Sequence, residues 1–221
     1  MQKLTAHGKF PNGLYRVFDK RCYAEDFLFQ GRFRLRNLRC YKEIEDKKRQ
    51  DQSEGHGHYR RPGMVTSVHF SCDSEATKTE TKPGYVETHV DFGNPIFIFC
   101  CSLLDADQGY LKQQFGSHIV RIHKPRRFAE DISTFLESLP YKFAGGIEGC
   151  IVKYNKGRII QTALGSVDRT RLSYAQKPAD FRREKEYRLV SIIGGSPINR
   201  FNDDYITVDI GGALDYVELL D

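Results

Sequence analysis

The sequence has no long apolar run and no apolar segment near its start. No stretch approaches the roughly 18 consecutive apolar residues that a membrane-spanning helix needs. Residues 1–10, MQKLTAHGKF, lack the apolar core of a secretory signal. These absences predict that no helix of the chain crosses a membrane and that the protein stays in the cytoplasm, where it is made.

The sequence also lacks the spacings that cysteine-based metal sites and disulfide frameworks use. None of its six cysteines forms a CxxC pair, and Cys100 and Cys101 are adjacent in an apolar segment. We therefore expect reduced, mostly buried thiols. His56 and His58 lie in a polar, glycine-containing stretch without a second pair of ligand residues, so we expect no metal site there.

Several motifs of common enzyme classes are missing as well. There is no GxSxG elbow, which argues against an α/β-hydrolase type of serine enzyme. There is also no P-loop, no dinucleotide-binding GxGxxG and no HExxH. If the chain binds a nucleotide, it holds the phosphates by something other than a glycine-rich turn.

What the sequence does contain is enough apolar material for one folded domain and an excess of clustered positive charge. Its 221 residues are 39% hydrophobic and 29% charged, with no internal repeat and no shift in composition that marks a linker. The net charge is +5, and basic residues gather beside aromatic ones in GRFRLRNLRCYK, HYRRP, HKPRRF and FRREKEYR. Such clusters favour a nucleic acid or another polyanion as partner, with an ordinary solvated surface as the alternative.

The hydrophobic pattern predicts many short strands and few helices. Residues 95–103, PIFIFCCSL, are the most apolar segment and are expected to form a central strand covered on both faces. Residues 43–63 contain almost no apolar residue and are expected to form a long polar loop, and residues 71–87 a turn-rich connection or hairpin. The other expected strands are 13–18, 33–38, 64–70, 118–123, 149–154, 186–192, 205–210 and 214–220, and the expected helices are 23–31 and 125–139.

Three of the expected strands carry polar residues at positions where a ligand could bind. Arg16 alternates with apolar neighbours, and a guanidinium in a cleft would pair with phosphate or carboxylate. Ser102 ends the most apolar segment, where its hydroxyl could contact a ligand or orient a carboxylate. Glu186 and Arg188 lie on one face of a later strand. The simpler alternatives stay open: an edge arginine in water, a serine bonded to the backbone and a Glu–Arg pair on the surface.

The order of these motifs resembles the start of bacterial ADP-ribosyltransferase-like toxins: LYR, then AEDFLFQG, then FRLRNL, then EDKKRQDQSEG. The segment EKEYRLV is similar to the closing strand of a broad bacterial family with the same split-sheet fold. The resemblance covers roughly residues 13–195. It implies an α+β fold, an ADP-ribosyltransferase-like split β-sheet core with few short helices, in a single domain over residues 1–221. It also implies NAD as a substrate and no metal.

The resemblance assigns roles to single residues. Arg16 matches the first-strand residue that grips NAD, and Ser102 matches the central-strand serine or tyrosine, although CCSLL lacks the Ser-Thr-Ser run of the protein-modifying branch. Glu186 matches the catalytic glutamate, and Glu184 competes with it because both carboxylates face the same strand end. Arg49 matches a loop arginine that assists catalysis. The complete expected catalytic and NAD-binding set is Tyr15, Arg16, Tyr23, Arg49, Ser102, Glu184 and Glu186.

The chemistry implied by the resemblance is transfer of ADP-ribose to nucleic acid. Cleavage between nicotinamide and ribose passes through an oxocarbenium-like transition state, which a nearby carboxylate stabilises. The basic clusters would hold a single-stranded RNA or DNA acceptor, and aromatic rings would stack on its bases. A neutralising antitoxin protein is the second implied partner, in a toxin–antitoxin system of phage defence. The expected acceptor contacts are Arg60, Arg61, Arg126 and Arg127, with Phe33, Tyr41 or Tyr59 for stacking.

Three alternatives remain open at the level of the sequence. The chain could be a protein-modifying ADP-ribosyltransferase, or a nuclease that holds a divalent metal with Asp46, Asp51 and Glu54. It could also be a nucleic-acid-binding module without catalytic activity. NAD consumption would separate a transferase from the other two, and dependence on a divalent metal would identify the nuclease.

Overall fold

A computed structural model describes residues 3–38, 40, 56–62, 70–72, 75–82, 85–92, 95–155, 159–160, 174–194 and 204–220. For the strands between residues 56 and 92 it describes the backbone only. The helices in this part of the chain are α1 (Arg21–Gln30), α2 (Gln108–Phe115), α3 (Pro125–Glu137) and a 3₁₀ helix, η2 (Ala179–Glu184).

Within the described residues, the main sheet has nine strands in a mixed arrangement. Its central path runs β1-β10-β14-β8-β2-β9-β16, and a branch of β3 and β15 joins it at β8. The pair β1 and β10 is parallel, and the other pairs are antiparallel. The strands are β1 (His7–Gly8), β2 (Leu14–Phe18), β3 (Arg32–Asn37), β8 (Ile96–Leu103), β9 (His118–Ile122), β10 (Glu148–Ile151), β14 (Glu186–Ile192), β15 (Tyr205–Asp209) and β16 (Val217–Leu220).

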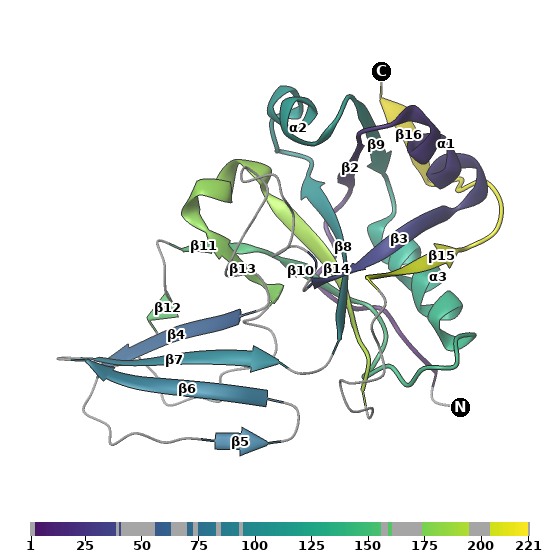
Figure 1. Cartoon of the computed structure of the whole chain (residues 1–221). Coiled ribbons are helices and arrows are strands. Elements are labelled where there is room, and N and C mark those ends of the chain that lie inside the picture. Colours follow the sequence, from purple (N-terminus) through teal and green to yellow (C-terminus); the bar gives the residue numbers. More distant parts are fainter. Residues whose placement is uncertain are drawn as a thin grey trace.

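The main sheet divides at β8. Ser102 near the end of this strand pairs with Tyr15 of β2, whereas Ile98 nearer its start pairs with Arg36 of β3. Between these two pairings, residues 99–101 have no strand partner on this side of β8 within the described residues. Strands β2, β9 and β16 therefore form one branch, and β3 and β15 form another that diverges from it (Figure 1).

Apolar side chains cover both faces of β8. On one face Phe99 lies in an aromatic cluster with Phe27 of α1, Phe33 of β3 and Phe128 of α3, with ring centroids 5.0–5.9 Å apart. On the other face Ile98 packs in a smaller cluster that includes Tyr174 and Val190. The prediction of a central strand covered on both faces is confirmed, because helices and irregular segments bury its two sides.

Two of the helices follow the sequence signals closely. Helix α1 ends where Gly31 adopts a left-handed φ of 63° and donates its N–H to the carbonyl of Asp26, a conformation that a residue with a Cβ rarely takes. Helix α3 begins with Pro125 and buries one face, which includes Phe128, Ile132 and Leu136. The short helix α2 was not predicted. It begins after Asp107, whose side chain accepts a hydrogen bond from the N–H of Tyr110.

The described residues also form two smaller sheets. Strands β12 (Ile159–Ile160), β4 (His56–Pro62), β7 (Tyr85–Phe92), β6 (Glu75–Lys82) and β5 (Phe70–Cys72) form a five-stranded sheet in that order. Strands β11 (Lys153–Asn155) and β13 (Gln176–Pro178) form a parallel pair. The hairpin of β6 and β7 confirms the expected hairpin in this region.

Two predictions about the strands were wrong. Residues 56–62, expected to lie in a loop, form β4, because their backbone pairs with β7. Residues 149–154, expected as one strand, divide into β10, which pairs with β14, and β11, which pairs with β13. Most of the expected strand at residues 64–70 lies outside the described residues.

The coarse fold prediction is confirmed: the chain folds as a mixed α/β protein with a large mixed sheet and few short helices. In the part of the chain that the structure describes, no helix is long and apolar enough to cross a membrane. The expectation of mostly buried thiols was only partly correct. Of the five described free cysteines, Cys101 and Cys150 are buried, Cys40 and Cys100 are half-buried, and Cys22 is exposed.

Candidate functional site

A cavity of about 570 Å³ lies along the gap where the main sheet divides. Its walls come from β2, β3, β8 and β15, from the start of α1, and from the segment that leads into β14. Cavities that bind organic ligands commonly have volumes of this order. The charged side chains that line it include Arg16, Arg34, Arg36, Lys177, Glu184 and Glu186.

Tyr15, Ser102 and Glu186 form a row across three neighbouring strands of this site. Ser102 of β8 lies opposite Tyr15 of β2 on one side and opposite Glu186 of β14 on the other. Residues opposite each other in antiparallel strands point to the same face of the sheet. All three residues are buried and line the cavity, and Tyr15 Oη accepts a hydrogen bond from Nε2 of Gln108 at 2.9 Å.

Glu186 is held by two cations from within the protein. Arg188 Nε donates to its Oε1 at 2.7 Å, and Arg188 Nη2 donates to its Oε2 at 3.3 Å. Lys177 Nζ lies 2.9 Å from Oε2. Arg188 is itself 1% exposed and also donates from Nη1 to the carbonyl of Tyr174 at 2.8 Å. The carboxylate of Glu186 is therefore fixed in place, as a buried carboxylate must be to remain charged.

Glu184 lies beside Glu186 because of a tight turn between them. Glu184 ends η2, and Lys185 has a positive φ of 43°, which is uncommon for a residue other than glycine. This turn brings both carboxylates to one ammonium group, since Lys177 Nζ lies 2.9 Å from Oε2 of Glu184 and 2.9 Å from Oε2 of Glu186. Unusual backbone conformations of this kind are frequent at functional sites.

The two carboxylates differ in how they titrate. Burial alone would raise the pKa of Glu186, but the charges of Arg188 and Lys177 outweigh burial and hold this pKa below its ordinary value of 4.5. Burial raises the pKa of Glu184 to about 7, because the attraction of Lys177 offsets burial only in part and the negative charge of Glu186 adds to it. Near neutral pH, Glu186 is thus a constant anion and Glu184 exchanges a proton.

Arg16 reaches into the gap beside β8. Its Nη1 donates to the carbonyl of Cys100 at 2.6 Å, and its guanidinium lies over the rings of Phe99 and Phe18 at 4.8 and 5.4 Å from their centroids. Its buried Nε has no hydrogen-bond partner, and none of the described carboxylates forms a salt bridge with it. Among the described residues no carboxylate pairs with this guanidinium, so it can pair with an anionic ligand in the cavity, as the pyrophosphate of NAD would require.

The structure brings together all six of the expected catalytic and NAD-binding residues that it describes. They line the same cavity, and they are Tyr15, Arg16, Tyr23, Ser102, Glu184 and Glu186. Tyr23 lies at the rim, with 45% of its surface exposed. The alternative that Glu186 and Arg188 form a pair on the surface is wrong, because both side chains are buried and hydrogen-bonded to each other.

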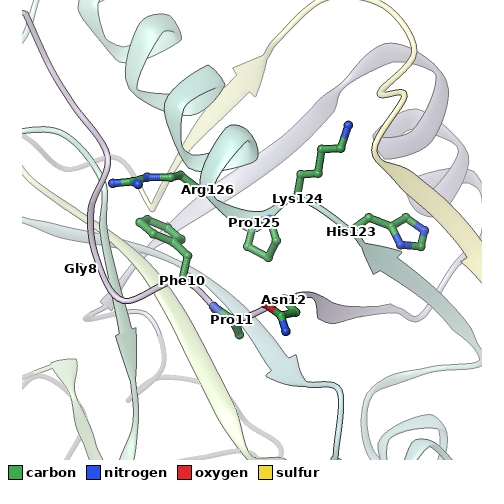
Figure 2. A pocket seen from close by; sticks show the side chains of 8 residues that line it. All are labelled: Gly8, Phe10, Pro11, Asn12, His123, Lys124, Pro125 and Arg126. Carbon is green, nitrogen blue, oxygen red and sulfur yellow. The ribbon is translucent and has the colours of Figure 1, made fainter.

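The expected acceptor-binding residues of α3 lie elsewhere. Arg126 lines a separate cavity of about 390 Å³ beside Phe10 and the first turn of α3 (Figure 2). Its guanidinium lies 3.6 Å from Glu130, and that of Arg127 lies 3.0 Å from Asp215. Neither arginine lines the cavity that contains Glu186. The structure therefore places these two side chains apart from the candidate catalytic carboxylates.

Of the remaining expected residues, Phe33 lines this cavity, and the side chains of the others are not described. Arg60, Arg61 and Tyr59 lie on β4, where only the backbone is described. Phe33 is 6% exposed within the aromatic cluster and offers little surface for stacking. The predictions for Tyr41, Asp46, Arg49, Asp51 and Glu54 lie outside the described residues.

Two features of the cavity were missed by the sequence analysis. Lys177 comes from the short strand β13 and gives no periodic signal that would associate it with Glu186. Arg34 and Arg36 were noted only as part of a basic cluster. Their alternation with buried Phe33 and Leu35 does show that they share one face, but which face borders the cavity depends on the pairing of β3 with β8.

Within the described residues, no group of three or more His, Cys, Asp or Glu side chains is placed to hold a metal ion. Comparison of the chain with protein-family models, with curated proteins and with solved structures gave no match.

Proposed function

We propose that this chain is an NAD-dependent ADP-ribosyltransferase that modifies single-stranded nucleic acid. One observation carries the proposal: a buried glutamate paired with two cations, and an arginine that pairs with none of the described carboxylates, line one cavity at a split in the sheet. A nucleotide with a pyrophosphate and a ribose needs these two kinds of group. By its motif resemblance, the enzyme would be the toxin of a toxin–antitoxin system and would bind a neutralising antitoxin.

Arg16 and Glu186 would act on the two ends of the bound NAD. Arg16 lines the cavity and would bind the pyrophosphate through guanidinium N–H groups that face it. The carboxylate of Glu186 would face the ribose, where positive charge develops as the bond to nicotinamide breaks. Because Arg188 and Lys177 keep this carboxylate ionised and oriented, it needs no rearrangement during the reaction.

Glu184 would take the proton of the acceptor. In the transfer step the bond between the ribose C1′ and nicotinamide breaks, and neutral nicotinamide leaves with the electron pair. A nucleophilic atom of the acceptor forms the new bond to C1′ and loses a proton. With a pKa of about 7, Glu184 can accept that proton near neutral pH, as general bases typically do. Lys177 contacts both carboxylates and would keep them on one side of the ribose.

The proposal is tested by incubating the protein with NAD labelled in its adenylate part and with separate pools of RNA, single-stranded DNA and protein. We expect label to enter a nucleic-acid pool, to be lost on nuclease treatment and to resist protease. The variant Glu186→Gln should transfer little label. Glu148→Gln is the matched control, because Glu148 lies on the neighbouring strand β10, does not line the cavity and accepts its hydrogen bond from Tyr174.

The other outcomes of this experiment identify the alternatives. Label that resists nuclease and is lost to protease would show a protein acceptor. Degradation of nucleic acid without NAD, abolished by a chelator, would show a metal-dependent nuclease. Binding of nucleic acid without consumption of NAD would show a module without catalytic activity. Each of these results would replace the proposed function.

A further inference from the structure

The ribbon of β3 and β15 presents a row of polar side chains beside the candidate catalytic site. Arg32, Arg34 and Arg36 alternate with buried residues along β3 and are exposed. In the antiparallel register, Arg34 lies opposite Thr207 and Arg36 lies opposite Tyr205, so these side chains point to one face. Arg34, Arg36, Tyr205 and Thr207 all line the cavity that contains Glu186.

This face is continuous with the face that bears the catalytic carboxylate. Arg36 lies opposite Ile98 of β8, and Ser102, four residues further along β8, lies opposite Glu186. Because residues four apart in a strand point to the same side, Arg36 and Glu186 share one face of the sheet. A molecule that lies along the ribbon therefore extends toward Glu186.

Arg34 is the cation of this row with the most capacity for a ligand. Arg32 forms a salt bridge with Asp209 at 3.0 Å, which neutralises its charge. Arg34 instead lies over the ring of Tyr205, 4.2 Å from the centroid, and pairs with no carboxylate among the described residues. Tyr205 is itself 42% exposed. An arginine stacked on an exposed tyrosine offers both a phosphate contact and an aromatic surface for a base.

The spacing of the arginines also suits a nucleic-acid strand. Alternate residues of a β-strand are about 6.7 Å apart, close to the distance between successive phosphates of an extended single strand. A row of cations on one face of a strand can follow such a backbone, and aromatic stacking tolerates any base. By contrast, the arginines of α3 are paired with Glu130 and Asp215 and lie outside this cavity.

We propose that the face formed by Arg34, Arg36, Tyr205 and Thr207 binds the single-stranded nucleic-acid acceptor. Arg34 and Arg36 contact successive phosphates, and Tyr205 stacks on a base, so that the strand leads toward Glu184 and Glu186. This inference rests on the proposed function, because it identifies the acceptor site of the proposed transfer reaction. It is tested by binding alone, without NAD.

The experiment measures binding of a fluorescent single-stranded oligonucleotide by anisotropy at several salt concentrations. Arg34→Gln should weaken binding about tenfold at low salt and lower the slope of log Kd against log salt by about one, because one phosphate contact is lost. Tyr205→Ala should weaken binding by about tenfold with the salt slope unchanged, because stacking releases no counterions. Duplex DNA should bind more weakly than the single strand.

Arg127→Gln is the matched control, because Arg127 is also half-exposed and also lies over a tyrosine ring, at 4.9 Å from the centroid of Tyr216. It should bind the oligonucleotide like the wild type. The inference is overturned if the wild type fails to bind, if Arg34→Gln and Tyr205→Ala both bind normally, or if Arg127→Gln loses as much affinity as they do. A lack of NAD cleavage by the wild type would refute the proposed function and would leave this binding result intact.

Discussion

Replacement of Arg188 by methionine tests whether the buried ion pair between Arg188 and Glu186 stabilises the fold. Arg188 is 1% exposed and makes two hydrogen bonds to Glu186, at 2.7 and 3.3 Å, and one to the carbonyl of Tyr174 at 2.8 Å. Arg188→Met removes all three donors and leaves the carboxylate of Glu186 buried with fewer partners.

The expected loss of stability depends on the partners that Glu186 keeps after the replacement. Removing one partner of a buried ion pair costs about 3–5 kcal/mol, because the other charge is left without compensation. Lys177 still lies 2.9 Å from Glu186, so we expect the lower end of this range, a loss of about 3 kcal/mol in the free energy of unfolding. The double variant Arg188→Met with Glu186→Leu removes both charges and should recover most of the loss, since apolar replacements of a buried pair are often neutral.

The free energy of unfolding of the wild type, Arg188→Met and the double variant is measured by urea denaturation at pH 7. Unfolding is followed by circular dichroism, because the chain has no tryptophan whose fluorescence could report it. The denaturant slope should be similar in all three, so that differences in midpoint report stability. A loss below about 1 kcal/mol in Arg188→Met would refute the reasoning. So would a double variant that is no more stable than Arg188→Met.

Two further predictions concern Arg16 and Glu184. Arg16→Lys should weaken NAD binding about tenfold by calorimetry, because an ammonium group cannot reproduce the guanidinium fork; unchanged affinity at a wild-type melting temperature would return Arg16 to a purely structural role. The folded pKa of Glu184, about 7, exceeds its ordinary value of 4.5, so its contribution to stability is complete below pH 4.5 and is lost as the pH rises through 7. The free energy of unfolding, measured by urea denaturation, should therefore decrease more between pH 5 and pH 8 for the wild type than for Glu184→Gln. Equal decreases would contradict the raised pKa of Glu184.

Most individual elements could be predicted because their signals are local. Arg34 and Arg36 alternate with buried Phe33 and Leu35, which identifies β3, and the left-handed glycine at position 31 identifies the end of α1. Strand β4 could not be found this way, since its polar sequence HGHYRRP forms a strand only through pairing with β7.

The site could be predicted in its chemistry but not in its geometry. Glu186 and Arg188 are two apart in a strand, so their position on one face follows from the sequence alone, whereas their buried hydrogen bond does not. The alignment of Tyr15, Ser102 and Glu186 depends on the register of three strands that are distant in the chain, and the contact of Lys177 with Glu184 depends on the turn at Lys185. The sequence clusters around Arg126 and Arg127 likewise give no sign of which surface they occupy.

The release of nicotinamide from NAD tests the central claim most directly. It is measured by chromatography for the wild type and for Glu186→Gln, at a temperature where both proteins are folded by circular dichroism. We predict that the wild type releases nicotinamide and that Glu186→Gln does so at least about a hundredfold more slowly, the usual effect of removing one electrostatic stabiliser of a transition state. No release by the wild type, or release at the same rate by Glu186→Gln, would contradict the claim that this cavity cleaves NAD through Glu186.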